Sequence, residues 1–185
     1  TISRVLNNSG YVKEETRQKV LKAVDEYNYV PSAIARSLSI QDSLSVGTII
    51  PDIENEFFSK VISGISEVAE SYHYNIVFLG TNETLEKEHD FLKIVESQRL
   101  KGVIITPISE TDTVTRDYLL RLEESGIPVV LVDRDVKGAQ FDGVFVDNQQ
   151  GSYDGVMALI KAGHERIAII TGPETSKPGK DRCQG

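Results

Sequence analysis

Polar side chains follow the apolar runs of this chain, at the points where each run ends. They occur in five segments: Pro51-Asp52, Thr106-Pro107-Ile108-Ser109, Asp133-Arg134-Asp135, Asp147-Asn148 and Thr171-Gly172-Pro173. In an open α/β sheet, ligands bind beyond the carboxyl ends of the strands, so these residues are the ones placed for chemistry. Carboxylates, hydroxyls and one guanidinium suit bidentate hydrogen bonding to a polyhydroxylated small molecule. The segments therefore predict a ligand site at this edge of the sheet.

Two aromatic residues, Phe57 and Phe58, follow the first apolar run after a short loop. They can supply an apolar face for a sugar ring or a base. The alternative is that both belong to the core at the start of a helix, and that the aspartates are helix caps or turn formers. Because polar residues follow five apolar runs, a binding site is favoured over caps and turns for the set as a whole.

Catalytic chemistry finds little support in the sequence. No G-x-G-x-x-G follows the first apolar run, and the chain has no Gly-Lys-Ser/Thr phosphate loop. The three histidines have neither a partner at i+4 nor a nearby cysteine pair, which argues against a metal site or a general base. Asp133 and Asp135 flank Arg134, an arrangement that favours an ion-paired loop over a catalytic carboxylate pair. We therefore predict a binding protein that is not an enzyme and uses no metal or cofactor.

The composition is that of an ordinary globular protein, with 39% hydrophobic and 26% charged residues in a chain of 185. The net charge of −8 is uneven: residues 1–45 carry six Lys and Arg against five Asp and Glu, so residues 46–185 carry −9. The single cysteine, Cys183, cannot form an internal disulfide and indicates a reducing compartment. No apolar run approaches the ~20 residues that span a bilayer, and no signal pattern opens the chain, so we predict a cytoplasmic protein with no membrane partner.

From Ser45 onward, apolar runs alternate with amphipathic helical patterns. The runs cover residues 46–50, 75–79, 102–106, 128–132, 144–146 and 166–170, and the helical patterns cover residues 57–72, 91–95, 114–122 and 153–160. Continuous runs rich in β-branched residues predict strands that are buried on both faces, as in a parallel sheet. Strands that alternate with helices predict right-handed βαβ units and a doubly wound, mostly parallel α/β sheet.

The first 45 residues have a different pattern. Residues 2–6 and 14–27 show short helical patterns, separated by the turn formers at 7–10. Two helices of this length bury little between them, so we expect a partner helix before Thr1 and a chain truncated at its front. Residues 31–38 begin with proline and end with leucine, which predicts a short hinge helix.

The order and spacing of these segments resemble the lactose/galactose-repressor family of bacterial transcription regulators. The resemblance rests on Thr1-Ile2-Ser3-Arg4-Val5-Leu6-Asn7, Gly10-Tyr11-Val12, Glu15-Thr16-Arg17, Ala33-Ile34-Ala35-Arg36-Ser37-Leu38, Ile50-Pro51-Asp52-Ile53, Asn55, Phe57-Phe58, Val146-Asp147-Asn148, Gly163-His164, Arg166-Ile167, Arg182 and Gly185. It implies a partial helix-turn-helix DNA-binding domain over residues 1–30 and a hinge helix with its linker over residues 31–45. Residues 46–185 would be the N-terminal part of an effector domain like a type I periplasmic binding protein, with the C-terminal subdomain missing. Lys13 stands where such proteins usually have a helix-capping Ser or Thr.

The resemblance also implies two sets of site residues. Those expected to contact operator DNA are Thr1, Ser3, Arg4, Asn7, Tyr29, Ser32, Ala35 and Leu38. Within this set, Arg4 would bind a guanine in the major groove, and Leu38 would insert into the minor groove and bend the operator. Those expected to bind the effector are Phe57, Phe58, Ser109, Asp133, Asp147 and Arg182, of which Arg182 rests on the resemblance alone.

The function that the resemblance implies is a repressor that binds a pseudopalindromic operator as a homodimer and responds to a small sugar or sugar phosphate. A solute-binding protein of a sugar transport system is the alternative, since it shares the core, but it has no use for the recognition and hinge helices. A Rossmann-type oxidoreductase comes third, because the glycine fingerprint is missing.

Overall fold

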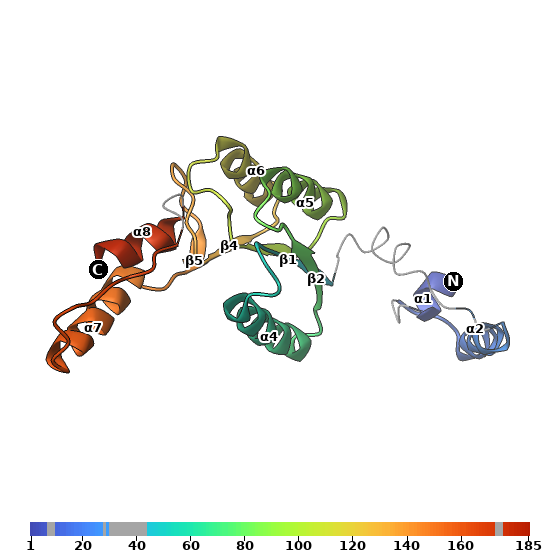
Figure 1. Cartoon of the computed structure of the whole chain (residues 1–185). Helices are drawn as coiled ribbons and strands as arrows, with labels where there is room; N and C mark the ends of the chain where they lie inside the picture. The colour runs from blue at the N-terminus through green and yellow to red at the C-terminus, as the bar shows by residue number, and fades with distance from the viewer. Residues whose placement is uncertain (7–9, 28, 30–43, 173–175) are drawn as a thin grey trace. The chain divides into compact units, whose positions relative to one another are not determined.

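The computed structural model describes residues 1–6, 10–27, 29, 44–172 and 176–185. The chain divides into two compact units, Thr1–Asp42 and Ser43–Gly185, and each is described by itself (Figure 1). Four of the expected DNA-contacting residues, Asn7, Ser32, Ala35 and Leu38, lie outside the described residues.

The first unit contains helices α1 (Ile2–Leu6) and α2 (Glu14–Glu26). Val5 is buried, whereas the side chains of α2 are half-buried or exposed. Lys13 occupies the N-cap position of α2 and offers only a donor, so its side chain cannot accept from the first-turn N–H groups. The acidic Glu14 and Glu15 in that turn compensate through the helix dipole.

The second unit is built on a five-stranded sheet with the order β2-β1-β3-β4-β5. Its strands are β1 (Ser45–Ile50), β2 (Asn75–Gly80), β3 (Gly102–Ile105), β4 (Val129–Val132) and β5 (Asp142–Val144). Every neighbouring pair in this sheet is parallel. The predicted mostly parallel α/β sheet is therefore confirmed.

Helices cover both faces of the sheet, with α5 and α6 on one side and α4 on the other (Figure 1). The helices of this unit are α4 (Glu56–Ser71), α5 (Leu85–Ser97), α6 (Thr113–Glu124), α7 (Asn148–Lys161) and α8 (Lys177–Gln184). None of the helices in the described ranges combines the length and the apolarity that a bilayer span requires.

The hydrophobic core lies between the sheet and helices α5 and α6. Its members include Ile49, Val103, Ile105, Val129 and Leu131 from the strands, and Leu92, Val95, Leu119 and Leu122 from the helices. The strand members lie at alternate positions, as period-2 geometry requires. Gly47 also faces this core: a Cβ there would lie 3.1 Å from Leu100 and 3.2 Å from Val95. A Cβ at position 47 would therefore require these two side chains to shift by a few tenths of an ångström.

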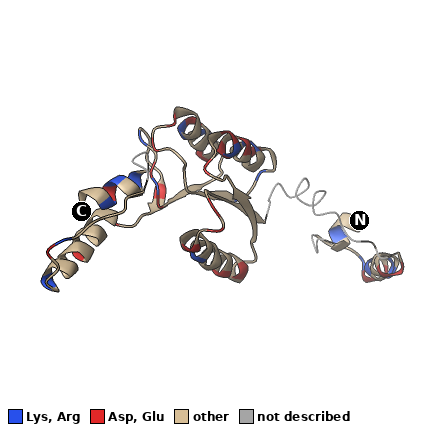
Figure 2. Ribbon diagram, in the orientation of Figure 1, with Lys and Arg blue, Asp and Glu red and all other residues tan. Residues whose placement is uncertain are grey.

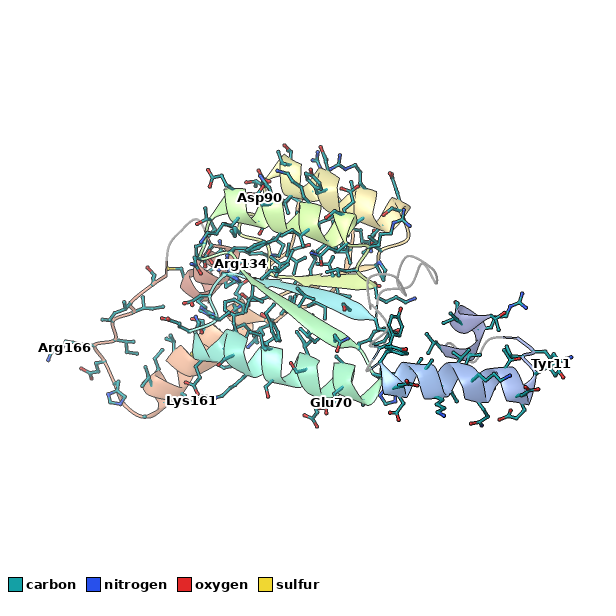
Figure 3. The ribbon with its side chains drawn as sticks, turned by 90° about the vertical axis from the view of Figure 1, so that its right-hand side faces the viewer. Tyr11, Glu70, Asp90, Arg134, Lys161 and Arg166 are labelled. Atoms are coloured by element: carbon teal, nitrogen blue, oxygen red, sulfur yellow. The ribbon has the colours of Figure 1, made fainter. Side chains whose placement is uncertain are left out.

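The prediction of a strand at residues 166–170 is wrong. These residues are described but form no strand, and Ile169 and Ile170 are 55% and 101% exposed. A strand needs a neighbour for its backbone N–H and C=O groups, and none of the described residues pairs with this segment, which projects away from the sheet at Arg166 (Figure 3). Similarly, the strand expected at 144–146 ends at Val144 in the structure.

Helix α8 was not predicted, because its residues show no apolar stripe and include Pro178 and Gly179. The available signal was Ser176 at the N-cap followed by a proline in the first turn, since proline fits the first turn of a helix at no cost in hydrogen bonds.

The core predicts a large effect for truncation at Leu92, which is fully buried on α5. Leu92→Ala should lower the free energy of unfolding by about 2–5 kcal/mol, because it removes apolar contacts and leaves a cavity. The matched control is Val68→Ala on α4, where the side chain is 59% exposed and the change should stay within about 0.5 kcal/mol. Urea unfolding followed by circular dichroism measures both, and equal losses would contradict this placement of the core.

Candidate ligand site at the strand ends

The carboxyl ends of the five parallel strands lie along one edge of the sheet, which brings the loops that follow them together. Arg134, directly after Asp133 at the end of β4, lies at this edge (Figure 3). Its guanidinium donates to both carboxylate oxygens of Glu83, at 2.9 and 3.1 Å, and to the carbonyl oxygen of Pro107 at 3.4 Å. Through these bonds, Arg134 connects the loops after β2, β3 and β4 across the edge of the sheet.

Asp133 is a half-buried carboxylate with a left-handed backbone, φ 66°. Its N–H donates to the carbonyl oxygen of Val144 at 2.9 Å, which fixes the backbone between β4 and β5. Burial raises the pKa of Asp133, and the positive charges of Arg134, Arg182 and Lys177 oppose that rise. The structure therefore brings Asp133 within electrostatic range of Arg182, as an effector site that uses both residues requires.

Arg182 is held by contacts between α7 and α8. Its Nε donates to Oδ1 of Asn148 at 2.8 Å, and its carbonyl oxygen accepts from the hydroxyl of Ser152 at 2.6 Å. Asn148 is 7% exposed and also donates to the carbonyl oxygen of Val146 at 3.2 Å. The amide of Asn148 is thus satisfied on both sides, which fixes the position of the arginine.

Asp147 is the N-cap of α7 and accepts from the N–H of Gln150 at 2.9 Å. The sequence left a binding role and a capping role open for this residue, and the structure gives it the cap. Asp147 also lines a cavity of about 400 Å³, whose other polar lining includes Asn148, Ser152 and Arg182. Asp147 and Arg182 therefore line the same cavity, and their role in binding an effector stays a prediction.

The remaining expected effector residues do not belong to the lining of this cavity among the described residues. Phe57 is 42% exposed and Phe58 is buried, with the two rings edge to face at 5.1 Å. Both belong to the first turn of α4, where Asn55 caps the helix by accepting from the N–H of Phe57. Ser109 lies in the loop after β3, where its Oγ accepts from the N–H of Thr111 at 3.3 Å.

Glu88 on α5 organises the loop after β3 and was missed, because in the sequence it is one acidic residue among several on a helix. Its carboxylate accepts from the N–H of Ile108 at 2.8 Å and from the hydroxyl of Thr115 at 2.6 Å. Next to it, Nε2 of His89 lies 2.9 Å from a carboxylate oxygen of Asp112. Glu88 thus fixes the loop that carries Ser109 to the helices beneath it.

The pKa of Glu88 is raised by burial, and the hydrogen bonds from Thr115 and Ile108 oppose the rise. A raised carboxyl pKa means that the folded state binds the proton more tightly than the unfolded state. The stability that Glu88 contributes is therefore fully present below pH 4.5, the ordinary pKa of a glutamate. It is lost as the pH rises through the pKa that Glu88 has in the folded state.

This predicts that Glu88→Gln reduces the loss of stability on going from pH 4.5 to pH 8. The amide can accept from Ile108 through its oxygen and donate to the Thr115 hydroxyl, so the bonds survive without the charge. Glu88→Ala should cost about 1–3 kcal/mol, because the N–H of Ile108 loses its partner. The measurement is urea unfolding across this pH range, with Glu86→Gln, an exposed acid on the same helix, as the matched control. Parallel pH profiles for wild type and Glu88→Gln would contradict the prediction.

Comparisons with known proteins cover both units of the chain. Residues 1–32 match the family described as "Bacterial regulatory proteins, lacI family", and residues 43–185 match "Periplasmic binding proteins and sugar binding domain of LacI family". Catabolite control protein A of Priestia megaterium is 35% identical over 93% of this chain and 51% of its own length. The ribose operon repressor of Halalkalibacterium halodurans is 37% identical over 100% of this chain and 54% of its own length. The chain thus spans about half the length of the curated relatives that it matches.

Solved structures agree with this similarity. A LacI-family transcriptional regulator from Silicibacter pomeroyi is 34% identical, with a TM-score of 0.78 over 99% of this chain and 54% of that one. The lac repressor dimer bound to operator and the anti-inducer ONPF has the same TM-score of 0.78 over 98% of this chain and 54% of that one. Because the sequence identity is 24%, this similarity shows the fold alone.

Proposed function

Since the chain belongs to the LacI family of bacterial regulatory proteins, we propose that it is part of a DNA-binding transcriptional repressor controlled by a small sugar-like effector. The observation that carries this proposal is the order of the two family matches, a regulatory head over residues 1–32 followed by a sugar-binding domain over residues 43–185. The regulator would act in the cytoplasm as a homodimer on a pseudopalindromic operator.

The proposal divides the chain into three functional parts. Residues 1–30 would be part of the helix-turn-helix reading head, residues 31–45 the hinge, and residues 46–185 the N-terminal part of the effector domain. In the head, α1 presents Arg4 as an exposed side chain, which suits contact with a base edge. Tyr29 is 54% exposed and therefore accessible to DNA, as are Thr1 and Ser3.

The effector would occupy the strand-end edge, near the cavity lined by Asp147 and Arg182. A guanidinium fixed by an amide, beside carboxylates at two strand ends, can bind neighbouring hydroxyls of a sugar or the phosphate of a sugar phosphate. Binding would act by population shift, favouring the arrangement of the effector domain that separates the hinge helices and weakens their contact with DNA.

A solute-binding protein of a sugar transport system is the second candidate, because the family description of residues 43–185 includes periplasmic binding proteins. The regulatory family match over residues 1–32 and relatives named as repressors and regulators favour the repressor. A head that binds no DNA, in a protein whose core binds a sugar, would favour the transport protein.

The repressor proposal predicts that Arg4→Ala in the intact protein lowers operator affinity by roughly 1–3 kcal/mol and relaxes the preference at one operator position. Lys22→Ala on α2 is the matched control, because removing an exposed charge from the head should weaken binding without changing the consensus. Operator selection followed by sequencing measures both. An unchanged consensus for Arg4→Ala would show that this residue does not bind a base.

The effector site predicts that Arg182→Ala lowers effector affinity by about 1–3 kcal/mol, because buried polar partners are left unmatched. Asp147→Asn tests the carboxylate without loss of the cap, since asparagine caps helices as well as aspartate. Calorimetry with the sugar or sugar phosphate that a thermal-shift panel identifies provides the measurement, and operator binding should remain at wild-type strength. Wild-type affinity in both variants would place the effector elsewhere.

A further inference from the structure

Helix α8 carries positive charge toward the acidic end of the sheet. Lys177, Lys180 and Arg182 come from this helix (Figure 2). The loops after β3 and β4 supply carboxylates, among them Asp133, whose pKa is influenced by the charges of Lys177 and Arg182 after the larger effect of burial. Charge complementarity therefore connects α8 to strand-end loops that lie far away in the sequence.

Glu110, in the loop after β3, contacts two other segments of the chain. Its Oε1 lies 3.2 Å from Nζ of Lys137, in the loop after β4, and 3.8 Å from Nζ of Lys180 on α8. Its carbonyl oxygen accepts from the N–H of Lys137 at 2.7 Å. The Glu110 side chain is 12% exposed, whereas those of Lys137 and Lys180 are 66% and 47% exposed. The Glu110 carboxylate is thus mostly buried, while the two lysines reach it from solvent.

The position of α8 determines the position of Arg182. Lys180 and Arg182 are two residues apart on this short helix, and Arg182 reaches Asn148 and Ser152 on α7. Lys177 pairs with Asp181 within the helix at 2.6 Å. Among the described residues of α8, Lys180 is therefore the one with an ion pair to a strand-end loop.

We propose that Glu110 is a positioning residue that holds α8 against the strand ends through Lys180. Lys137 keeps the carboxylate in place from the other side, and the result is that Arg182 is presented to the cavity beside Asp147. This contact with the strand ends adds to the hydrogen bonds that connect α8 to α7. It is argued from the contacts of Glu110, whereas its consequence for effector binding rests on the proposed function.

An ion pair with a half-exposed lysine is weak and is screened by salt. The attachment of α8 is therefore adjustable, unlike the contacts of the aliphatic core, which do not depend on ionic strength in this way. A segment that must yield when a ligand enters or leaves is well served by such a contact, since little free energy separates the attached and released states.

The test is hydrogen exchange of the α8 amides in the intact protein, measured by mass spectrometry without any effector. Glu110→Gln should raise the exchange rate of the peptide that covers residues 176–185 by about two- to fivefold, the effect expected for the loss of a partly exposed ion pair. Asp90→Asn is the matched control: it removes an ion pair with Lys93 on α5 and should leave the α8 peptide unchanged.

Two further measurements keep the proposal falsifiable if Glu110→Gln perturbs folding. Lys180→Gln should raise the exchange rate as much as Glu110→Gln does, and the double variant should exchange no faster than either single variant, because both changes remove the same ion pair. Raising the salt concentration should speed exchange of the α8 peptide more in wild type than in Glu110→Gln, where only the Lys177–Asp181 pair within the helix remains to be screened. Equal α8 exchange in wild type and Glu110→Gln, or additive effects of Glu110→Gln and Lys180→Gln, would overturn the proposal. Since no effector is used, a wrong assignment of the effector site would leave these results unaffected.

Discussion

A continuous layer of aliphatic side chains between the sheet and helices α5 and α6 fixes the position of the strand ends. Ile49, Ile105 and Leu131 lie in register on three neighbouring strands, and Leu92 and Leu119 meet them from the helices. All five side chains are fully buried, and close-packed interiors tolerate little displacement. The loops after the strands therefore begin from fixed points, which is the condition for building a ligand site from separate parts of the chain.

Buried polar groups then determine the course of those loops. Glu88 fixes the loop after β3 to α5 and α6, and Arg134 connects three loops through Glu83 and Pro107. A buried polar group without a partner costs about as much as a lost hydrogen bond, so the Glu88 carboxylate and the two terminal nitrogens of Arg134 restrict the loops to arrangements that satisfy them. Nε of Arg134 is buried without a hydrogen-bond partner among the described residues. The aliphatic core thus fixes the positions of the strand ends, and the polar side chains fix the loops that follow them.

The region after β5 is organised differently. Its two helices contact each other closely through Arg182, Asn148 and Ser152, while the segment before α8 exposes Ile169 and Ile170. Among the described residues, Lys180 of α8 forms an ion pair with Glu110 at the sheet edge, at 3.8 Å. The cavity beside Asp147 therefore has one firm wall, made by the cap of α7, and one adjustable wall, made by α8.

Much of the fold was readable from the sequence, because apolar runs of β-branched residues predict buried parallel strands whatever their neighbours are. That pattern placed Asp147 directly after a strand, whereas β5 ends at Val144 and Asp147 caps α7. Arg182, expected from the family resemblance alone, lines the same cavity as Asp147. The sequence could not show that residues 166–170 lack a strand partner, that Phe58 is buried while Phe57 is exposed, or that Glu88 is the acid beneath the β3 loop. Those outcomes depend on contacts between residues that are distant in the sequence, whereas periodicity reports only which face of an element is apolar. Local pattern determined the elements, and tertiary structure determined which polar groups met, because hydrogen bonds and ion pairs require their atoms to come within a few ångströms.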